Sequence, residues 1–225
     1  MMWTIWYMIF GCSKGEAIES GDDDVISVSA VDIPADQFEQ YGLQSELFEV
    51  ALKAFKKAQS TGVTSKTVYT IVDLRMHSKE KRLWTVNMQT GELLFHEVTT
   101  HGRLSDINHD GFLDTVSNVP QSKQTSVGLY KTAEVYTGSH GLSLRLDGLE
   151  KGFNDNARRR KIVIHGADYA GEEFIQKHGR LGRSLGCPSV SNDVSDELIS
   201  VIKEGSLLFM YTPNEDWLKG STFLQ

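Results

Sequence analysis

Apolar residues recur every three or four positions in one early stretch of the chain. Between residues 43 and 64 these positions form one stripe, lysines cover another face, and Gly62 ends the pattern. This spacing predicts an amphipathic helix over 43–64 that packs its stripe against a core. The apolar positions of the stripe are Leu43, Leu47, Ala51, Ala54, Phe55 and Ala58.

Most of the chain after residue 64 has the pattern of strands. Runs rich in β-branched and aromatic residues are separated by short segments rich in glycine and polar residues, which predicts strands joined by turns, the first of them in a hairpin. A short helical turn is expected at 171–178, and Asn192 and Asp193 are cap-type residues for a helix through Ile202. We therefore predict one mainly β domain of the α+β class with a few peripheral helices. The expected strands cover 67–74, 82–88, 93–100, 128–131, 142–146, 162–165 and 206–212.

The two ends of the chain differ from this domain. Residues 1–12 form a short apolar leader ending in Ile9-Phe10-Gly11-Cys12, which resembles a bacterial lipoprotein processing site. The leader lacks the positive charges that open a signal peptide, but it predicts export, with Cys12 as the lipidated residue. Residues 13–42 are predicted to be a polar tether, and 213–225 a C-terminal tail.

Charge and loop composition narrow the function classes. The formal net charge is −7, so no nucleic-acid partner is expected, and the basic run 158–161 is interpreted as a solvated face. The loop 106–114 has the opening spacing of a calcium loop but lacks the closing glutamate, since Ser117 stands there. We favour a hydrated Asx turn and leave calcium as the alternative. No cofactor or metal is predicted.

Candidate chemistry gathers around one of the two cysteines. Cys187 lies in the glycine-rich turn 182–188, and His165 ends a β-branched run upstream. A cysteine needs a neighbouring base or cation to become a thiolate, and His165 and Arg183 are the candidates. The N–H groups of Gly186 and Cys187 could stabilise an oxyanion, and a backbone carbonyl is expected to orient His165. The alternative is a buried, inert cysteine.

These residues resemble the murein L,D-transpeptidase catalytic domain family, whose signature is His-Gly, a spacer, Ser/Thr-His-Gly-Cys and a later Asn. His165, Ser184, Gly186, Cys187 and Asn192 fall on those positions. The similarity extends over about residues 65–212, through segments such as 127–132, 139–150 and 152–158. Two departures stand out: Leu185 replaces the histidine of the motif, and Ser189 stands where many relatives carry an arginine that is thought to meet a substrate carboxylate.

The resemblance implies a β-sandwich or barrel over 65–212 and a cysteine acyltransferase acting on peptidoglycan stem peptides. Cys187 would form a thioester, His165 would act as general base, and Ser184 and Gly186 would shape the turn. Arg183, Arg145, Tyr130 and Asn192 are candidate substrate contacts. For the arginines and the tyrosine, a structural ion pair or a core position is the alternative.

Two other functions stay open. The same chemistry with water as acceptor would make an L,D-carboxypeptidase or another stem-peptide hydrolase. The other open function is non-catalytic: a wall-binding protein, or a protein with a zinc site built from His140, His165, His178 and Cys187. All of these place the protein in the cell envelope, in the periplasm or anchored to a membrane through a lipidated Cys12. Oligomeric state is not predicted.

Overall fold

The computed structural model of the chain describes residues 32–225. The predicted leader, most of the predicted tether and Cys12 lie outside the described residues, so lipidation stays a prediction. No helix in the described part is both long and apolar enough to span a membrane.

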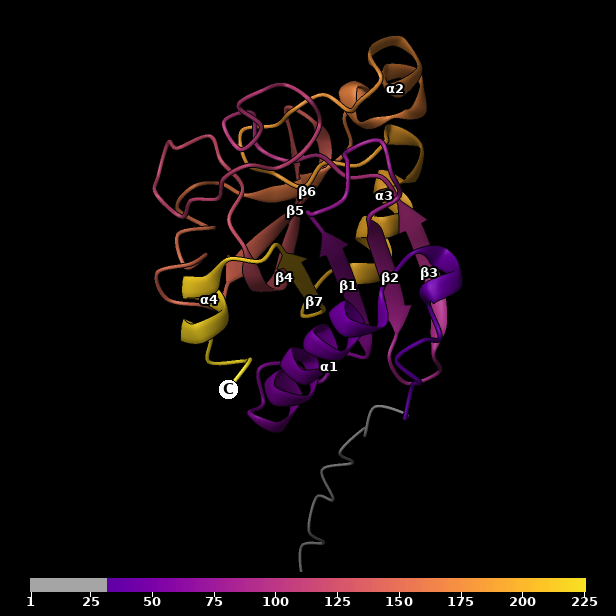
Figure 1. The fold of residues 1–225 in the computed structure, drawn as a ribbon, viewed down its shortest axis with the longest axis vertical. Helices are drawn as coiled ribbons and strands as arrows, with labels where there is room; N and C mark the ends of the chain where they lie inside the picture. Colours follow the sequence, from indigo (N-terminus) through magenta and orange to yellow (C-terminus); the bar gives the residue numbers. More distant parts are fainter. Residues whose placement is uncertain (1–31) are drawn as a thin grey trace, which may run out of the picture.

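Seven strands form one mixed sheet in the order β3-β2-β1-β7-β4-β5-β6 (Figure 1). β1 and β7 pair in parallel, and every other neighbouring pair is antiparallel. The prediction of a mainly β fold with peripheral helices is confirmed, with the strands joined in one sheet. The strands are β1 (Val68–Asp73), β2 (Leu83–Asn87), β3 (Glu92–Glu97), β4 (Gly128–Gly138), β5 (Gly141–Gly148), β6 (Val163–His165) and β7 (Leu207–Tyr211).

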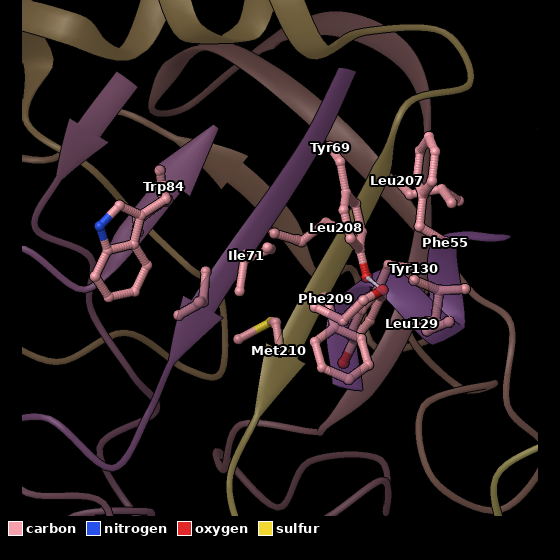
Figure 2. Packing of buried hydrophobic residues seen from close by; sticks show 14 of the residues in the cluster. Phe55, Tyr69, Ile71, Trp84, Leu129, Tyr130, Leu207, Leu208, Phe209 and Met210 are labelled. Carbon is pink, nitrogen blue, oxygen red and sulfur yellow. Dashed lines mark hydrogen bonds between the residues drawn. The ribbon is translucent and has the colours of Figure 1, made fainter. Parts of the chain in front are cut away.

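Helices cover both faces of the central strands. Figure 1 shows α1 (Ser45–Ser60) in front of the sheet and α3 (Asn192–Ile202) behind it. The predicted apolar stripe of α1 is buried, and Tyr69 of β1 donates a hydrogen bond from its hydroxyl to the Ala51 carbonyl at 2.9 Å. The Phe55 ring lies 5.1 Å from that of Tyr69, within the core drawn in Figure 2. Shorter helices are η1 (Glu39–Tyr41), η2 (Asp168–Ala170), α2 (Glu172–His178) and α4 (Glu215–Gly220).

Both segments expected to flank the domain pack against its core. At the C-terminal end, Trp217 of α4 is fully buried and its ring lies 5.5 Å from that of Phe209. At the other end, Ile33 and Phe38 are buried in the same cluster. The Tyr41 carbonyl accepts a hydrogen bond from the indole N–H of Trp84. The apolar residues in these polar segments are too sparse to produce a periodic signal, but each fills a site in the core.

Candidate active site

The turn that carries Cys187 is held by the Ser184 side chain. Ser184 Oγ accepts a hydrogen bond from the Gly186 N–H at 3.0 Å and donates one to the Cys187 carbonyl at 2.7 Å. Gly186 has φ +122°, and a Cβ there would lie 2.6 Å from the Gln124 carbonyl oxygen, so the turn requires glycine. Because its N–H bonds within the turn, Gly186 is not a free oxyanion donor, which corrects the expectation. Within residues 32–225 the Cys187 N–H has no hydrogen-bond partner and stays the candidate.

The segment after β3 supports this turn. Thr100 Oγ1 donates to the Cys187 carbonyl at 3.2 Å, and the His101 carbonyl accepts the Ser184 N–H at 3.0 Å. The His101 ring is 1% exposed, and its Nδ1 accepts from Arg82 at 3.0 Å. Burial and the Arg82 charge lower the pKa of His101 to about 4. His101 is therefore a neutral support behind the turn.

His165 lies at the end of β6, where the ring is held on two sides. Its Nδ1 is 2.8 Å from the Gly166 carbonyl oxygen; since a carbonyl only accepts, Nδ1 carries the proton. Nε2 therefore accepts a hydrogen bond from Ser189 Oγ, 2.9 Å away. The ring of His140 stacks on that of His165, with centroids 4.3 Å apart and planes at 24°. Burial, with a smaller contribution from His140, lowers the pKa of His165, so the ring is a free base at neutral pH.

Cys187 and His165 lie near opposite ends of the short strand β6. Cys187 Sγ lies 3.8 Å from the Lys161 carbonyl oxygen, just before the strand. The chain after Cys187 then runs beside β6, and the Val190 N–H donates to the His165 carbonyl at 3.1 Å. Within the described residues no hydrogen bond joins Sγ to the imidazole, and Ser189 occupies Nε2. Proton transfer between Cys187 and His165 therefore stays a prediction, and Ser189 links the turn to the ring.

The thiol is protonated in the resting protein. Burial raises the pKa of Cys187, and the Val163 N–H and the charge of Arg160 offset part of that rise. We expected His165 and Arg183 to lower this pKa, and the direction is the reverse because desolvation outweighs the stabilisation of the thiolate. Attack by sulfur therefore requires a base.

Arg160 is the cation beside the cysteine turn. Its Nη2 lies 3.1 Å from the position that a Cβ of Gly186 would occupy. Nη1 donates to the Ser117 carbonyl at 2.7 Å and to Ser126 Oγ at 3.0 Å. The described residues form no ion pair with Arg160, so its charge is uncompensated and acts on Cys187. The basic run predicted to be a solvated face thus has one half-buried member.

Replacing Arg160 with glutamine is expected to raise the pKa of the Cys187 thiol further, because a positive charge near the thiolate is lost. The rate of alkylation by iodoacetamide at neutral pH should fall about threefold to tenfold. Arg160→Lys keeps the charge and should retain most of the rate. Ser126→Ala removes one hydrogen bond of Arg160 but no charge, and serves as the matched control. An unchanged profile of alkylation rate against pH in Arg160→Gln would contradict this assignment.

Two predicted substrate contacts are engaged elsewhere. Tyr130 is fully buried in the core (Figure 2), and its hydroxyl donates to the Ser126 carbonyl at 2.8 Å. Its place in β4 leaves no polar atom for a substrate, which corrects the expectation. Arg145 is held by Glu134, with Nε–Oε1 at 3.0 Å, and its Cζ lies 4.3 Å from the ring centroid of Tyr136. Tyr130 is therefore a core tyrosine and Arg145 forms a structural ion pair, which are the alternatives that we considered to substrate contact.

Arg183 is tied to the neighbouring loop. Its Nη1 donates to the Asp106 carbonyl at 3.0 Å, and its Nη2 lies 3.2 Å from His109 Nδ1. These bonds join the cysteine turn to the loop 106–114, so Arg183 has a structural function there. Contact between Arg183 and a substrate stays a prediction.

The loop 106–114 is closed by its own carboxylates. Asp106 accepts the N–H groups of Asp110 at 3.0 Å and of Gly111 at 3.3 Å, which is the Asx turn that we favoured. No group of three histidine, cysteine, aspartate or glutamate side chains within residues 32–225 is arranged to hold a metal ion. The set proposed for zinc is therefore not assembled in this part of the chain.

Asn192, a candidate substrate contact, lies against Gly166, the residue after His165, since a Cβ at Gly166 would be 2.3 Å from its Oδ1. Its Nδ2 donates to Asp168 Oδ1 at 2.6 Å. Both residues line a pocket of about 350 Å³ together with His140 and Tyr169. Because His140 also stacks on His165, this pocket is next to the candidate base.

Sequence reasoning missed two residues of the site. Ser189 had an available signal, since it stands two positions after Cys187, but it was noted only as a departure from the motif. Arg160 had none, because a run of four basic residues does not indicate which one turns inward. His140 was considered only as a zinc ligand.

The chain belongs to the L,D-transpeptidase catalytic domain family, whose model matches residues 39–211. The resemblance drawn from the motifs is thereby confirmed. A comparison with curated proteins found no match.

The solved structures that are similar to this chain have low sequence identity to it. An L,D-transpeptidase from Mycobacterium smegmatis is 13% identical, with a TM-score of 0.40 over 65% of this chain and 59% of that chain. The helical cell shape determining protein Pgp2 of Campylobacter jejuni is 12% identical, with a TM-score of 0.44 over 74% and 57%. An L,D-transpeptidase from Stackebrandtia nassauensis is 14% identical, with a TM-score of 0.38 over 81% and 77%. The chain thus spans less than two thirds of the length of the first two.

Proposed function

We propose that the protein is a cysteine-dependent acyltransferase that acts on peptidoglycan stem peptides, as an L,D-transpeptidase of the cell envelope. The observation that carries this proposal is the membership of residues 39–211 in the L,D-transpeptidase catalytic domain family. The site supports it with a cysteine in a fixed turn and a neutral histidine joined to that turn through Ser189. By family resemblance the donor is a stem tetrapeptide, and the bond attacked links its L-centre to the terminal D-Ala.

The first step forms a thioester. Cys187 Sγ attacks the donor carbonyl carbon as its proton passes to His165 Nε2, and that proton then goes to the departing amine of D-Ala. The neutral ring has one acceptor lone pair, which Ser189 occupies at rest. The Ser189 hydroxyl must therefore relay the thiol proton or give way to it. The Cys187 N–H is the amide available for the oxyanion.

The second step decides between two activities. An amine of another stem peptide would resolve the thioester by transpeptidation, and water would resolve it by hydrolysis. The pocket beside His165 is open, with exposed side chains at Ser139, His140 and Asp168, so water can reach it. L,D-carboxypeptidase activity is accordingly the second candidate.

Incubating the purified protein with a stem tetrapeptide, and reading the products by mass spectrometry, tests the proposal. We expect release of D-Ala together with a cross-linked dimer; a tripeptide alone would identify the hydrolase. Cys187→Ser serves as the inactive control. A folded protein that leaves the tetrapeptide intact would contradict both activities.

A further inference from the structure

Arg82 is a buried cation that the proposed mechanism does not use. It lies just before β2, and its side chain is among the largest of the fully buried ones. Within residues 32–225 no carboxylate forms an ion pair with it, and its Nη1 donates to the Met76 carbonyl at 2.7 Å. A buried cation without a carboxylate partner costs free energy unless hydrogen bonds compensate it. The groups that accept the remaining hydrogen bonds of Arg82 are therefore informative.

The guanidinium of Arg82 holds the segment that follows β3. Its Nε and Nη2 both donate to the Thr99 carbonyl, at 3.1 and 2.8 Å, and Nη2 also donates to His101 Nδ1 at 3.0 Å. Because Nδ1 of this neutral ring accepts, Nε2 carries the proton, and it lies 3.4 Å from Asp106 Oδ2. Arg82 therefore fixes the residues on both sides of Thr100.

Segment 99–101 contacts the cysteine turn through groups that do not bind Arg82. Thr100 Oγ1 donates to the Cys187 carbonyl at 3.2 Å and accepts the Ser189 N–H at 3.0 Å. The Thr100 N–H donates to the Ser189 carbonyl at 3.0 Å. The segment thus joins the buried guanidinium to the backbone on which the sulfur is carried.

These contacts fix the peptide group that contains the candidate oxyanion donor. The Cys187 N–H belongs to the peptide between residues 186 and 187. Before this peptide, the Gly186 N–H is bonded to Ser184 Oγ; after it, the Cys187 carbonyl accepts from Ser184 and Thr100. With the groups on both sides held, the Cys187 N–H points in one direction, which is the preorganisation that oxyanion stabilisation requires.

We propose that Arg82 and Thr100 are positioning residues for acyl transfer, which together hold the Cys187 N–H where the oxyanion forms. This inference rests on the proposed function, because it requires attack of Cys187 on a carbonyl group. Such an attack places negative charge on the carbonyl oxygen. Alkylation by iodoacetamide does not, since sulfur displaces iodide from carbon and the thiol proton passes to solvent. A loss of positioning should therefore slow acylation more than alkylation.

The test measures both reactions of Cys187 by intact mass, with a carbapenem as the acyl donor and iodoacetamide as the alkylating agent. Both reactions use the same sulfur, so a change in its pKa affects both rates and largely cancels in their ratio. Arg82→Lys keeps the charge but loses the planar fork that holds two acceptors. It is expected to lower the ratio of acylation to alkylation about tenfold.

Thr100 provides a second variant that changes little in size. Thr100→Val removes the hydroxyl and should lower the ratio about as much as Arg82→Lys, whereas Thr100→Ser keeps the hydroxyl and should retain the ratio. The combined variant should lose no more than the larger single loss, because both residues act on one contact. Thr85→Val is the matched control: Thr85 is fully buried and its Oγ1 bonds to Thr70 at 3.0 Å. This variant should lose stability in thermal unfolding and keep the ratio.

The outcomes separate this inference from the proposed function. An unchanged ratio in a folded Arg82→Lys or Thr100→Val protein would overturn the inference, as would an equal loss in Thr85→Val or losses that multiply in the combined variant. The proposed function would still stand in each of these cases. If iodoacetamide alkylates the wild-type protein but the carbapenem does not acylate it, the proposed function is overturned, and this inference with it.

Discussion

Replacing Cys187 with serine is expected to lower turnover of a stem tetrapeptide by about 1,000-fold or more, with the fold intact. A serine hydroxyl has a far higher pKa than a thiol, and burial lowers the pKa of His165, so the hydroxyl proton is harder to remove than the thiol proton. The turn should survive, because Ser184 binds the backbone carbonyl of residue 187 rather than its side chain. Turnover and thermal unfolding measured on the same preparation check both statements.

The chain offers a matched control for this substitution. Cys12 is the only other cysteine, and Cys12→Ser replaces a sulfur that the proposed mechanism does not use. It should retain full turnover. If the Cys187→Ser protein keeps more than about a tenth of the wild-type rate, the sulfur of Cys187 is not the nucleophile.

Replacing Glu150 with alanine is expected to cost about 3–5 kcal/mol of unfolding free energy, the largest stability effect that we predict. Glu150 is 3% exposed, and its Oε2 accepts the Leu129 N–H at 2.7 Å and the Trp217 Nε1–H at 2.9 Å. Its Oε1 accepts the Ser221 hydroxyl. One carboxylate therefore joins β4 to α4, and its loss leaves buried donors unpaired.

Thermal unfolding measures this effect. We expect the midpoint of Glu150→Ala to fall by roughly 10 °C, whereas Glu197→Ala, an exposed change on α3, should shift it by no more than a degree or two. A loss below about 1 kcal/mol in Glu150→Ala would mean that α4 is not held to the sheet through this residue.

Local patterns predicted most of the fold because burial is periodic along the chain. The α1 stripe and the hairpin of β2 and β3 repeat at the spacings that their packing requires. The β-branched run before His165 indicated a strand ending at the candidate base, as observed. Each of these segments contains its own alternation of buried and exposed side chains, so its structure can be predicted from that segment alone.

The remaining features depend on which distant segments meet. The sequence around Ser189 contains nothing that aims its hydroxyl at a ring 24 positions earlier. Arg160 turns inward because loop carbonyls at residues 117 and 124 accept its hydrogen bonds. Tyr130 was expected in the site, and its position in a strand buried between neighbours placed it in the core instead. Local spacing carries no information about such contacts.

The central claim is that sulfur at position 187 becomes acylated. A carbapenem, whose strained ring is an acyl donor, provides the most direct measurement through intact mass and peptide mapping. We expect one adduct per chain, on the peptide that contains Cys187, and no adduct in Cys187→Ser. An adduct on another residue, or equal labelling of the serine variant, would contradict this claim.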